Sequence, residues 1–190
     1  MAMRNARSDS SRKRLATRTL ACMAMMAAIS VVLARFIIPM PNAFTRFSIE
    51  HLPIILSGLL FGPIPGALVG FVADLVGTLF SGYGYNPLFA VPPILIGLCT
   101  GLLRFLVIQK ESFLRILVSF LPAVILGSIL WQSYWLAAIY GSKSFEAFLV
   151  SRSIQFAVTS VINAILAFAL FKSGIFRSLH FWPPISKQQE

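Results

Sequence analysis

Charged residues are scarce in this chain of 190 residues: Asp, Glu, Lys and Arg together account for 12% of it, and only 6 residues are acidic. Soluble globular domains contain about 25% charged residues, because their whole surface faces water. Hydrophobic residues make up 57% of the chain, and its mean hydropathy is +0.83. Too few polar side chains are present to cover a soluble domain, so the composition predicts a membrane protein.

Cysteine and histidine are rare as well, with 2 of each. Cys22 and Cys99 lie in apolar runs, where they predict neither a disulfide framework nor a metal site. The phosphate-binding pattern G-x-x-x-x-G-K-S/T and the zinc-protease pattern H-E-x-x-H do not occur in the sequence, which argues against a built-in ATPase and a zinc hydrolase. We therefore expect no metal, no cofactor and no enzyme activity. An intramembrane hydrolase that pairs Ser128 with His51, and a small channel, stay open as alternatives.

Apolar runs dominate the rest of the chain. A helix needs about 20 apolar residues to cross a bilayer, and continuous runs favour helices over a transmembrane barrel of alternating strands. Six segments are predicted: Thr19–Ile38, Leu52–Phe61, Gly66–Phe80, Pro87–Ile108, Ile116–Ile139 and Phe145–Phe171. The expected fold is an all-α integral membrane protein, with a six-helix membrane domain at 18–172 between a basic tail, 1–17, and a C-terminal tail, 173–190.

The basic residues predict how these segments are oriented. If both termini and the loops after the second and fourth segments are cytoplasmic, only four of the 16 Lys and Arg residues face outward: Arg35, Arg46, Lys143 and Arg152. This distribution agrees with the positive-inside rule. We therefore predict a multi-pass protein of the bacterial cytoplasmic membrane, with both termini cytoplasmic. Anionic lipid headgroups, rather than nucleic acid, are the expected partners of its net charge of +10.

Aromatic side chains gather on the same outer side as the four exceptional cations. They are Tyr83, Tyr85, Trp131, Tyr134, Trp135 and Tyr140. An interfacial aromatic belt would occupy both membrane faces, so the one-sided set favours an outer pocket. Arg35 and Arg152 lie in or beside apolar segments, where a charge is costly. They either extend to the headgroups, pair with the nearby glutamates, or bind an anionic ligand.

Polar residues at helical spacing support a pocket. They are Ser128, Gln132 and Trp135 in the fifth segment, and Arg152, Gln155, Thr159 and Asn163 in the sixth. Each set shares one helix face. Such residues either join helices or line a cavity, and we favour the cavity. Aromatic rings, amides and arginines would suit a flat, hydrogen-bonding anion.

Small residues predict close helix packing on other faces. They are Ala21, Ala24 and Ala28 in the first segment, Gly66, Gly70, Ala73 and Gly77 in the third, and Gly97 and Gly101 in the fourth. Asp74, in the middle of the third segment, either hydrogen-bonds a neighbouring helix or serves in proton coupling or as a conformational latch, and we favour the hydrogen bond.

Several short motifs follow one another early in the chain: Arg46-Phe47-Ser48-Ile49, Leu52-Pro53, Leu59-Leu60-Phe61-Gly62-Pro63, Gly66-Ala67-Leu68-Val69-Gly70 and Ala73-Asp74-Leu75-Val76-Gly77. In order and spacing they resemble the folate-specific substrate-binding (S) components of energy-coupling-factor (ECF) vitamin transporters, and the similarity extends over roughly residues 18–172. The loop Gly82-Tyr83-Gly84-Tyr85-Asn86-Pro87 differs from the Tyr-Phe-Pro-Gly-Phe pattern of many folate members. Another vitamin or a nucleobase-like compound therefore stays open as the substrate.

The resemblance implies an S-component bundle with a vitamin site near its outer side and a gate in the first loop. Transport would need a transmembrane coupling subunit and two cytoplasmic ATPases, and the loaded S component would reorient in the membrane to release its substrate. The stripe of Ala21, Ala24 and Ala28 resembles the surface on which S components dock the coupling subunit.

Together, the residue pattern and the resemblance predict a subunit that binds folate or a reduced folate. The expected carboxylate contacts are Arg35, Arg46 and Arg152. The expected ring-stacking or wall residues are Phe44, Tyr83, Tyr85, Trp131 and Trp135. The residues expected to hydrogen-bond the ring edges are Asn86, Gln132, Gln155 and Asn163.

Overall fold

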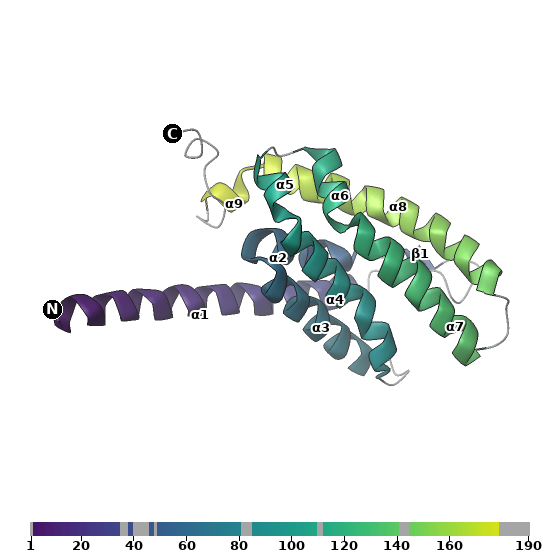
Figure 1. Cartoon of the computed structure of the whole chain (residues 1–190), viewed down its shortest axis with the longest axis horizontal. Coiled ribbons are helices and arrows are strands. Elements are labelled where there is room, and N and C mark those ends of the chain that lie inside the picture. Colours follow the sequence, from purple (N-terminus) through teal and green to yellow (C-terminus); the bar gives the residue numbers. More distant parts are fainter. Residues whose placement is uncertain are drawn as a thin grey trace.

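The computed structural model describes residues 2–34, 38–39, 46–47, 49–80, 85–109, 112–140 and 145–178. The helices pack lengthwise into one bundle, from which the N-terminal half of α1 (Ala2–Leu33) projects (Figure 1). The short helix α9 (Ile175–Ser178) lies at the same end of the bundle as this projecting half. This placement agrees with an even number of membrane crossings.

Among the described residues, six apolar helices form the bundle, in the number and order expected from the sequence. They are the apolar part of α1, α2 (His51–Phe61), α3 (Pro63–Leu79), α4 (Pro87–Leu102), a continuous fifth helix made of α6 (Phe113–Ala123), η1 (Val124–Trp131) and α7 (Gln132–Tyr140), and α8 (Phe145–Lys172). Two stretches, Phe113–Ile139 with 27 residues and Leu149–Lys172 with 24, are each long and apolar enough to cross a bilayer, and the other apolar helices are shorter.

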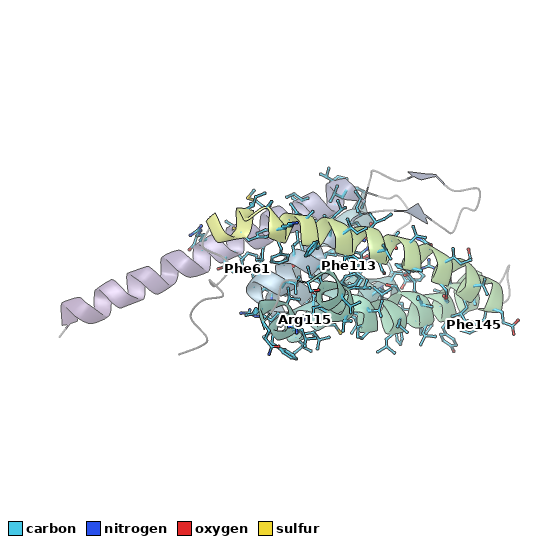
Figure 2. All side chains as sticks on the ribbon, turned by 90° about the horizontal axis from the view of Figure 1, so that it is seen from above. Phe61, Phe113, Arg115 and Phe145 are labelled. Carbon is cyan, nitrogen blue, oxygen red and sulfur yellow. The ribbon has the colours of Figure 1, made fainter. Side chains whose placement is uncertain are left out.

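The fifth helix and α8 run antiparallel and build one side of the bundle. Figure 2 shows Phe113, at the start of the fifth helix, in the half of the bundle that lies opposite Phe145, at the start of α8. Phe61 and Arg115 lie in the same half as Phe113. Because the two helices run in opposite directions, the C-terminal end of the fifth helix, which is the outer end in the predicted orientation, lies beside the N-terminal end of α8.

A glycine turn joins α2 to α3, at the position where the sequence predicted a tight turn. Gly62 has a φ of 104°, a conformation that residues with a Cβ rarely adopt. Its N–H donates to the carbonyl of Gly58 at 2.9 Å, which completes the last turn of α2. Pro63 then occupies the first turn of α3, where its missing N–H is not needed.

Glycines bring α3 and α4 into backbone contact, which confirms the close packing predicted for these faces. A Cβ on Gly66 would lie 2.4 Å from the carbonyl oxygen of Gly97, and a Cβ on Gly97 would lie 2.1 Å from that of Gly66. A Cβ on Gly77, which belongs to the same predicted face, would lie in open space with no atom within 4 Å. The close packing therefore ends before the last turns of α3.

Two local features differ from the sequence prediction. The fourth segment, predicted as continuous over Pro87–Ile108, breaks at Leu103 between α4 and α5 (Arg104–Gln109). Arg115 fixes α5 to the fifth helix by donating from Nη1 to the carbonyl of Leu106 at 3.0 Å. The loop predicted at Pro39–Ser48 contains the paired strands β1 (Ile38–Pro39) and β2 (Arg46–Phe47).

Candidate functional site

A small cavity lies inside the bundle where α2, α4, the fifth helix and α8 meet. Its volume is about 10 Å³, room for about one water molecule, and its lining consists of His51, Ile55, Ile96, Phe120, Val124, Phe156, Thr159, Ser160 and Asn163. Ligand pockets have volumes of roughly 300–1,000 Å³. The described lining alone is therefore too tight for a vitamin-sized molecule, although it is polar on the α8 side.

The polar stripe of α8 faces the interior, as its spacing predicted. Arg152, Gln155, Thr159 and Asn163 have relative exposures of 8%, 8%, 7% and 3%. Asn163 donates from Nδ2 to the carbonyl of Thr159 at 2.8 Å, while its Oδ1 is buried and has no hydrogen-bond partner among the described residues. The guanidinium of Arg152 lies 5.9 Å from the ring centroid of Phe156. A buried face with a cation toward its outer end and an amide deeper in the bundle is therefore present.

A π-helix changes which residues of the fifth helix face the interior. In η1 the hydrogen bonds run over five residues, as in the bond from the N–H of Gln132 to the carbonyl of Gly127. Ser128 and Ser133 are both fully buried, whereas Gln132 and Trp135 are only half-buried. The prediction that Ser128, Gln132 and Trp135 share one buried face assumed an α-helical repeat. It is wrong for Gln132, because the wider turns of η1 place Ser133 in the buried position instead.

Three aromatic side chains cluster near the outer end of the fifth helix. The ring centroids of Trp131 and Trp135 are 5.9 Å apart, and those of Tyr134 and Trp135 are 5.6 Å apart with the rings nearly perpendicular. Trp131 is 38% exposed and donates from Nε1 to the carbonyl of Leu88 at 2.9 Å. Trp135 Nε1 is buried without a hydrogen-bond partner among the described residues. Of these rings, Trp135 has an unused donor inside the protein.

The remaining predicted site residues lie at the helix ends or outside the described residues. Tyr85 is 39% exposed. Asn86 caps α4, since its Oδ1 accepts from the N–H of Leu88 at 3.1 Å. Arg46 is described only through its backbone in β2. Arg35, Phe44 and Tyr83 lie outside the described residues.

Sequence reasoning missed the contribution of α2 to the cavity. His51 begins α2 and lies edge-on to Phe156 of α8, with ring centroids 6.2 Å apart. No local pattern connects these two residues, which are far apart in the chain. Ser128 Oγ has no hydrogen-bond partner among the described residues, so His51 does not activate it as the hydrolase alternative would require.

The alanine stripe of α1 is open on the surface. Ala21, Ala24 and Ala28 are all exposed. An apolar groove with about 710 Å³ of empty space runs between Ala24 and Ala28 on α1 and Val72, Val76 and Phe80 on α3. In α3, Asp74 Oδ2 is buried without a partner among the described residues, while the backbone carbonyl of Asp74 accepts from Thr78 Oγ1 at 2.9 Å.

A family profile described as "ECF transporter, substrate-specific component" matches residues 18–176. The chain belongs to this family. The family resemblance found in the sequence is therefore confirmed, and members of this family are membrane-embedded substrate-binding subunits of transporters rather than enzymes.

Individual relatives agree with this assignment. The folate transporter FolT of Clostridium novyi (strain NT) is 26% identical over 151 residues, which cover 79% of this chain and 86% of the relative. A crystal structure of FolT bound with folic acid is 27% identical, with a TM-score of 0.68 over 83% of this chain and 94% of that one. The S component for biotin from an ECF-type ABC transporter has a TM-score of 0.66 over 88% of this chain and 97% of that one at 16% identity, and this likeness shows the fold alone. The predicted S-component fold is confirmed.

Proposed function

We propose that this S component binds folate, or a reduced folate, from outside the cell and delivers it inward. The similarity to FolT, in sequence and to a FolT structure that holds folic acid, carries the proposal. The buried polar face of α8 supports it, because a polar surface inside an apolar bundle is costly unless a ligand or other polar partner uses it.

The order of the polar groups along α8 suggests how the ligand lies. Folate has a flat heteroaromatic ring at one end and carboxylates at the other. Arg152, near the outer end of α8, would bind a carboxylate in charge-assisted hydrogen bonds. Asn163 lies three helical turns further in and carries an unused acceptor, so it would bind the ring edge. The ring end would therefore enter the bundle first.

Aromatic residues of the fifth helix would hold the ring. Trp135 offers a ring face and an unused buried N–H, and Trp131 packs against it. We propose Gln155 and Gln132 as further contacts of the ring, and Arg35, Phe44, Arg46, Tyr83, Tyr85 and Asn86 as contributions of the outer loops. Since the cavity of about 10 Å³ is far below the usual ligand-pocket volume, binding requires its walls to move apart.

Transport requires partners that supply energy. We propose a transmembrane coupling subunit and two cytoplasmic ATPases, with Ala21, Ala24 and Ala28 as the docking face of the coupling subunit. Their exposure and small size support this, since small side chains let another helix approach closely. The proposed location is the bacterial cytoplasmic membrane with both termini inside, in agreement with the placement of α1 and α9 at one end (Figure 1).

Ligand extraction tests the proposal directly. The purified protein is denatured, and the compounds released from it are identified by mass spectrometry, with a mock purification as the control. A pteridine compound is the expected result, and titration of the emptied protein with folic acid should then saturate at one ligand per chain, while biotin should not bind. Recovery of a different vitamin, together with no folic acid binding, would contradict folate as the substrate.

A further inference from the structure

Several buried hydroxyl groups in the α-helical parts of the chain are satisfied by their own helix, while Ser30 of α1 donates to the carbonyl of Glu50 at 2.6 Å. Ser57, Thr100 and Ser119 donate to the carbonyls of Ile54, Ile96 and Ile116 at 2.8, 2.7 and 2.7 Å. These carbonyls lie three or four residues earlier in the chain, which is the usual arrangement for a hydroxyl inside an α-helix. Such residues need no other partner.

Two serines of the fifth helix break this rule. Ser128, inside η1, and Ser133, just after it, are both 0% exposed, and the Oγ of each has no hydrogen-bond partner among the described residues. The wider π-turns move the preceding carbonyls away from the positions that a serine hydroxyl reaches in an α-helix. An unsatisfied buried hydroxyl destabilises the fold, so alanine would be the more stable choice at either position.

The same two serines follow, along the fifth helix, the residues that line the cavity. Phe120, Val124 and Ser128 follow one another at intervals of four residues, and Phe120 and Val124 line the cavity. Ser133 is five residues beyond Ser128, the interval that hydrogen bonds span in a π-helix. Neither serine is among the residues that line the cavity, so a ligand reaches the two hydroxyls only when the cavity extends along this helix.

We infer that Ser128 and Ser133 bind the polar edge of the transported ligand's ring, and that the π-helix turns both hydroxyls toward it. The inference rests on the proposed function, because it assigns these residues to the same ligand. Rare π-segments in α-helices occur frequently at functional sites. Here the segment makes two hydroxyls available that an α-helix would have bonded to its own backbone.

The chemistry of the other unsatisfied atoms narrows the ligand class. The fifth helix also carries the unused donor Trp135 Nε1, and α8 carries the unused acceptor Asn163 Oδ1. A ring that matches this set must have several acceptor atoms and at least one N–H donor on its edge. A fused heteroaromatic ring with ring nitrogens, a carbonyl and an amino group fits this description, whereas an aliphatic or purely hydrocarbon ligand does not.

Serine-to-alanine variants test the inference. We compare Ser128→Ala and Ser133→Ala with Ser119→Ala, a buried serine of the same helix whose hydroxyl is satisfied by its own backbone. Folic acid binding is measured on the full chain in lipid nanodiscs by isothermal titration. A net hydrogen bond contributes about 0.5–1.5 kcal/mol, so each of the first two variants should weaken binding about 2- to 12-fold. Ser119→Ala should leave binding within twofold of the unchanged protein.

Two further readouts separate ligand binding from a structural role. The melting temperature of the ligand-free protein should stay the same or rise in Ser128→Ala and Ser133→Ala, because no protein hydrogen bond is lost. Folic acid analogues with a ring acceptor removed (5-deaza and 8-deaza forms, and aminopterin, which has an amino group in place of the carbonyl) complete the comparison. At least one analogue should bind the variant and the unchanged protein equally, since the deleted hydroxyl has lost its partner.

The possible failures are distinguishable. If the unchanged protein does not bind folic acid, the proposed function is wrong. If it binds but both serine variants bind equally well, the hydroxyls are satisfied by water instead and the inference is overturned. A lower melting temperature in the ligand-free variants would also overturn it, because the hydroxyls would then be structural.

Discussion

Replacing Arg152 with methionine should separate its binding role from a structural one. Methionine keeps a long apolar side chain that can pack on Phe156, but it removes the guanidinium that lies 5.9 Å from that ring. Charge-assisted hydrogen bonds contribute about 1.5–3 kcal/mol. If Arg152 binds a ligand carboxylate, folic acid binding should weaken about 10- to 140-fold.

Protein stability is measured beside affinity, because Arg152 is only 8% exposed and its replacement also changes contacts within the protein. A loss of folic acid affinity that exceeds the change in stability of the ligand-free protein is the result expected of a ligand-binding arginine.

The assay is isothermal titration in nanodiscs, combined with thermal unfolding of the ligand-free protein. Pteroic acid, which lacks the glutamate of folic acid and keeps one carboxylate, is the second ligand. The loss should be larger for folic acid if Arg152 binds the glutamate. Arg115→Met is the matched control, since Arg115 donates to the carbonyl of Leu106 and should affect stability alone. Unchanged folic acid affinity in Arg152→Met would refute the assignment.

Three further predictions address the ring, the packing and the docking face. Trp135→Ala should weaken folic acid binding by about 1–3 kcal/mol, the range measured for stacking of a base on an aromatic side chain, and unchanged titration curves would contradict the stacking role. Gly97→Ala should lower the free energy of unfolding by at least about 1–3 kcal/mol, because its Cβ would lie 2.1 Å from the carbonyl oxygen of Gly66. Gly77→Ala is the control and should have little effect, because its Cβ would meet no atom within 4 Å. Ala24→Leu should abolish co-purification with the coupling subunit while leaving folic acid affinity intact, and retained co-purification would show that the partner binds elsewhere.

The sequence predicted correctly wherever one physical rule governs a whole segment. Continuous apolar runs bounded by polar or turn residues identified the six helices, two of which have the length that a bilayer requires. The stripe of Arg152, Gln155, Thr159 and Asn163 is buried as predicted, since α8 is one regular helix and the 3.6-residue repeat holds throughout it. The glycine faces of α3 and α4 could be predicted for the same reason, since the α-helical repeat holds at those positions.

The parts that could not be predicted depend on contacts between distant residues. The cavity joins His51 with Phe156, which lie at opposite ends of the membrane domain in sequence. The break at Leu103 separates two helices within the run predicted as one segment, Pro87–Ile108, and Arg104, the charged residue of that run, follows the break directly. The outer loops that hold Arg35, Phe44 and Tyr83 lie outside the described residues, so their binding roles stay predictions.

The π-helix is the most informative of these differences, because it is both unpredictable and costly. Hydrophobic periodicity assigns one repeat to a whole run, so a local widening shifts every later residue of the helix without any signal in composition. Here the shift leaves Ser128 and Ser133 buried and unpaired, a loss of about 1–3 kcal/mol for each hydroxyl. In the same helix, the satisfied Ser119 shows that a buried serine carries no such penalty in regular α-geometry. Among these three serines of the fifth helix, the free-energy cost of an unsatisfied hydroxyl therefore falls on Ser128 and Ser133. A ligand with hydrogen-bond acceptors on its ring would remove this cost by bonding to the two hydroxyls.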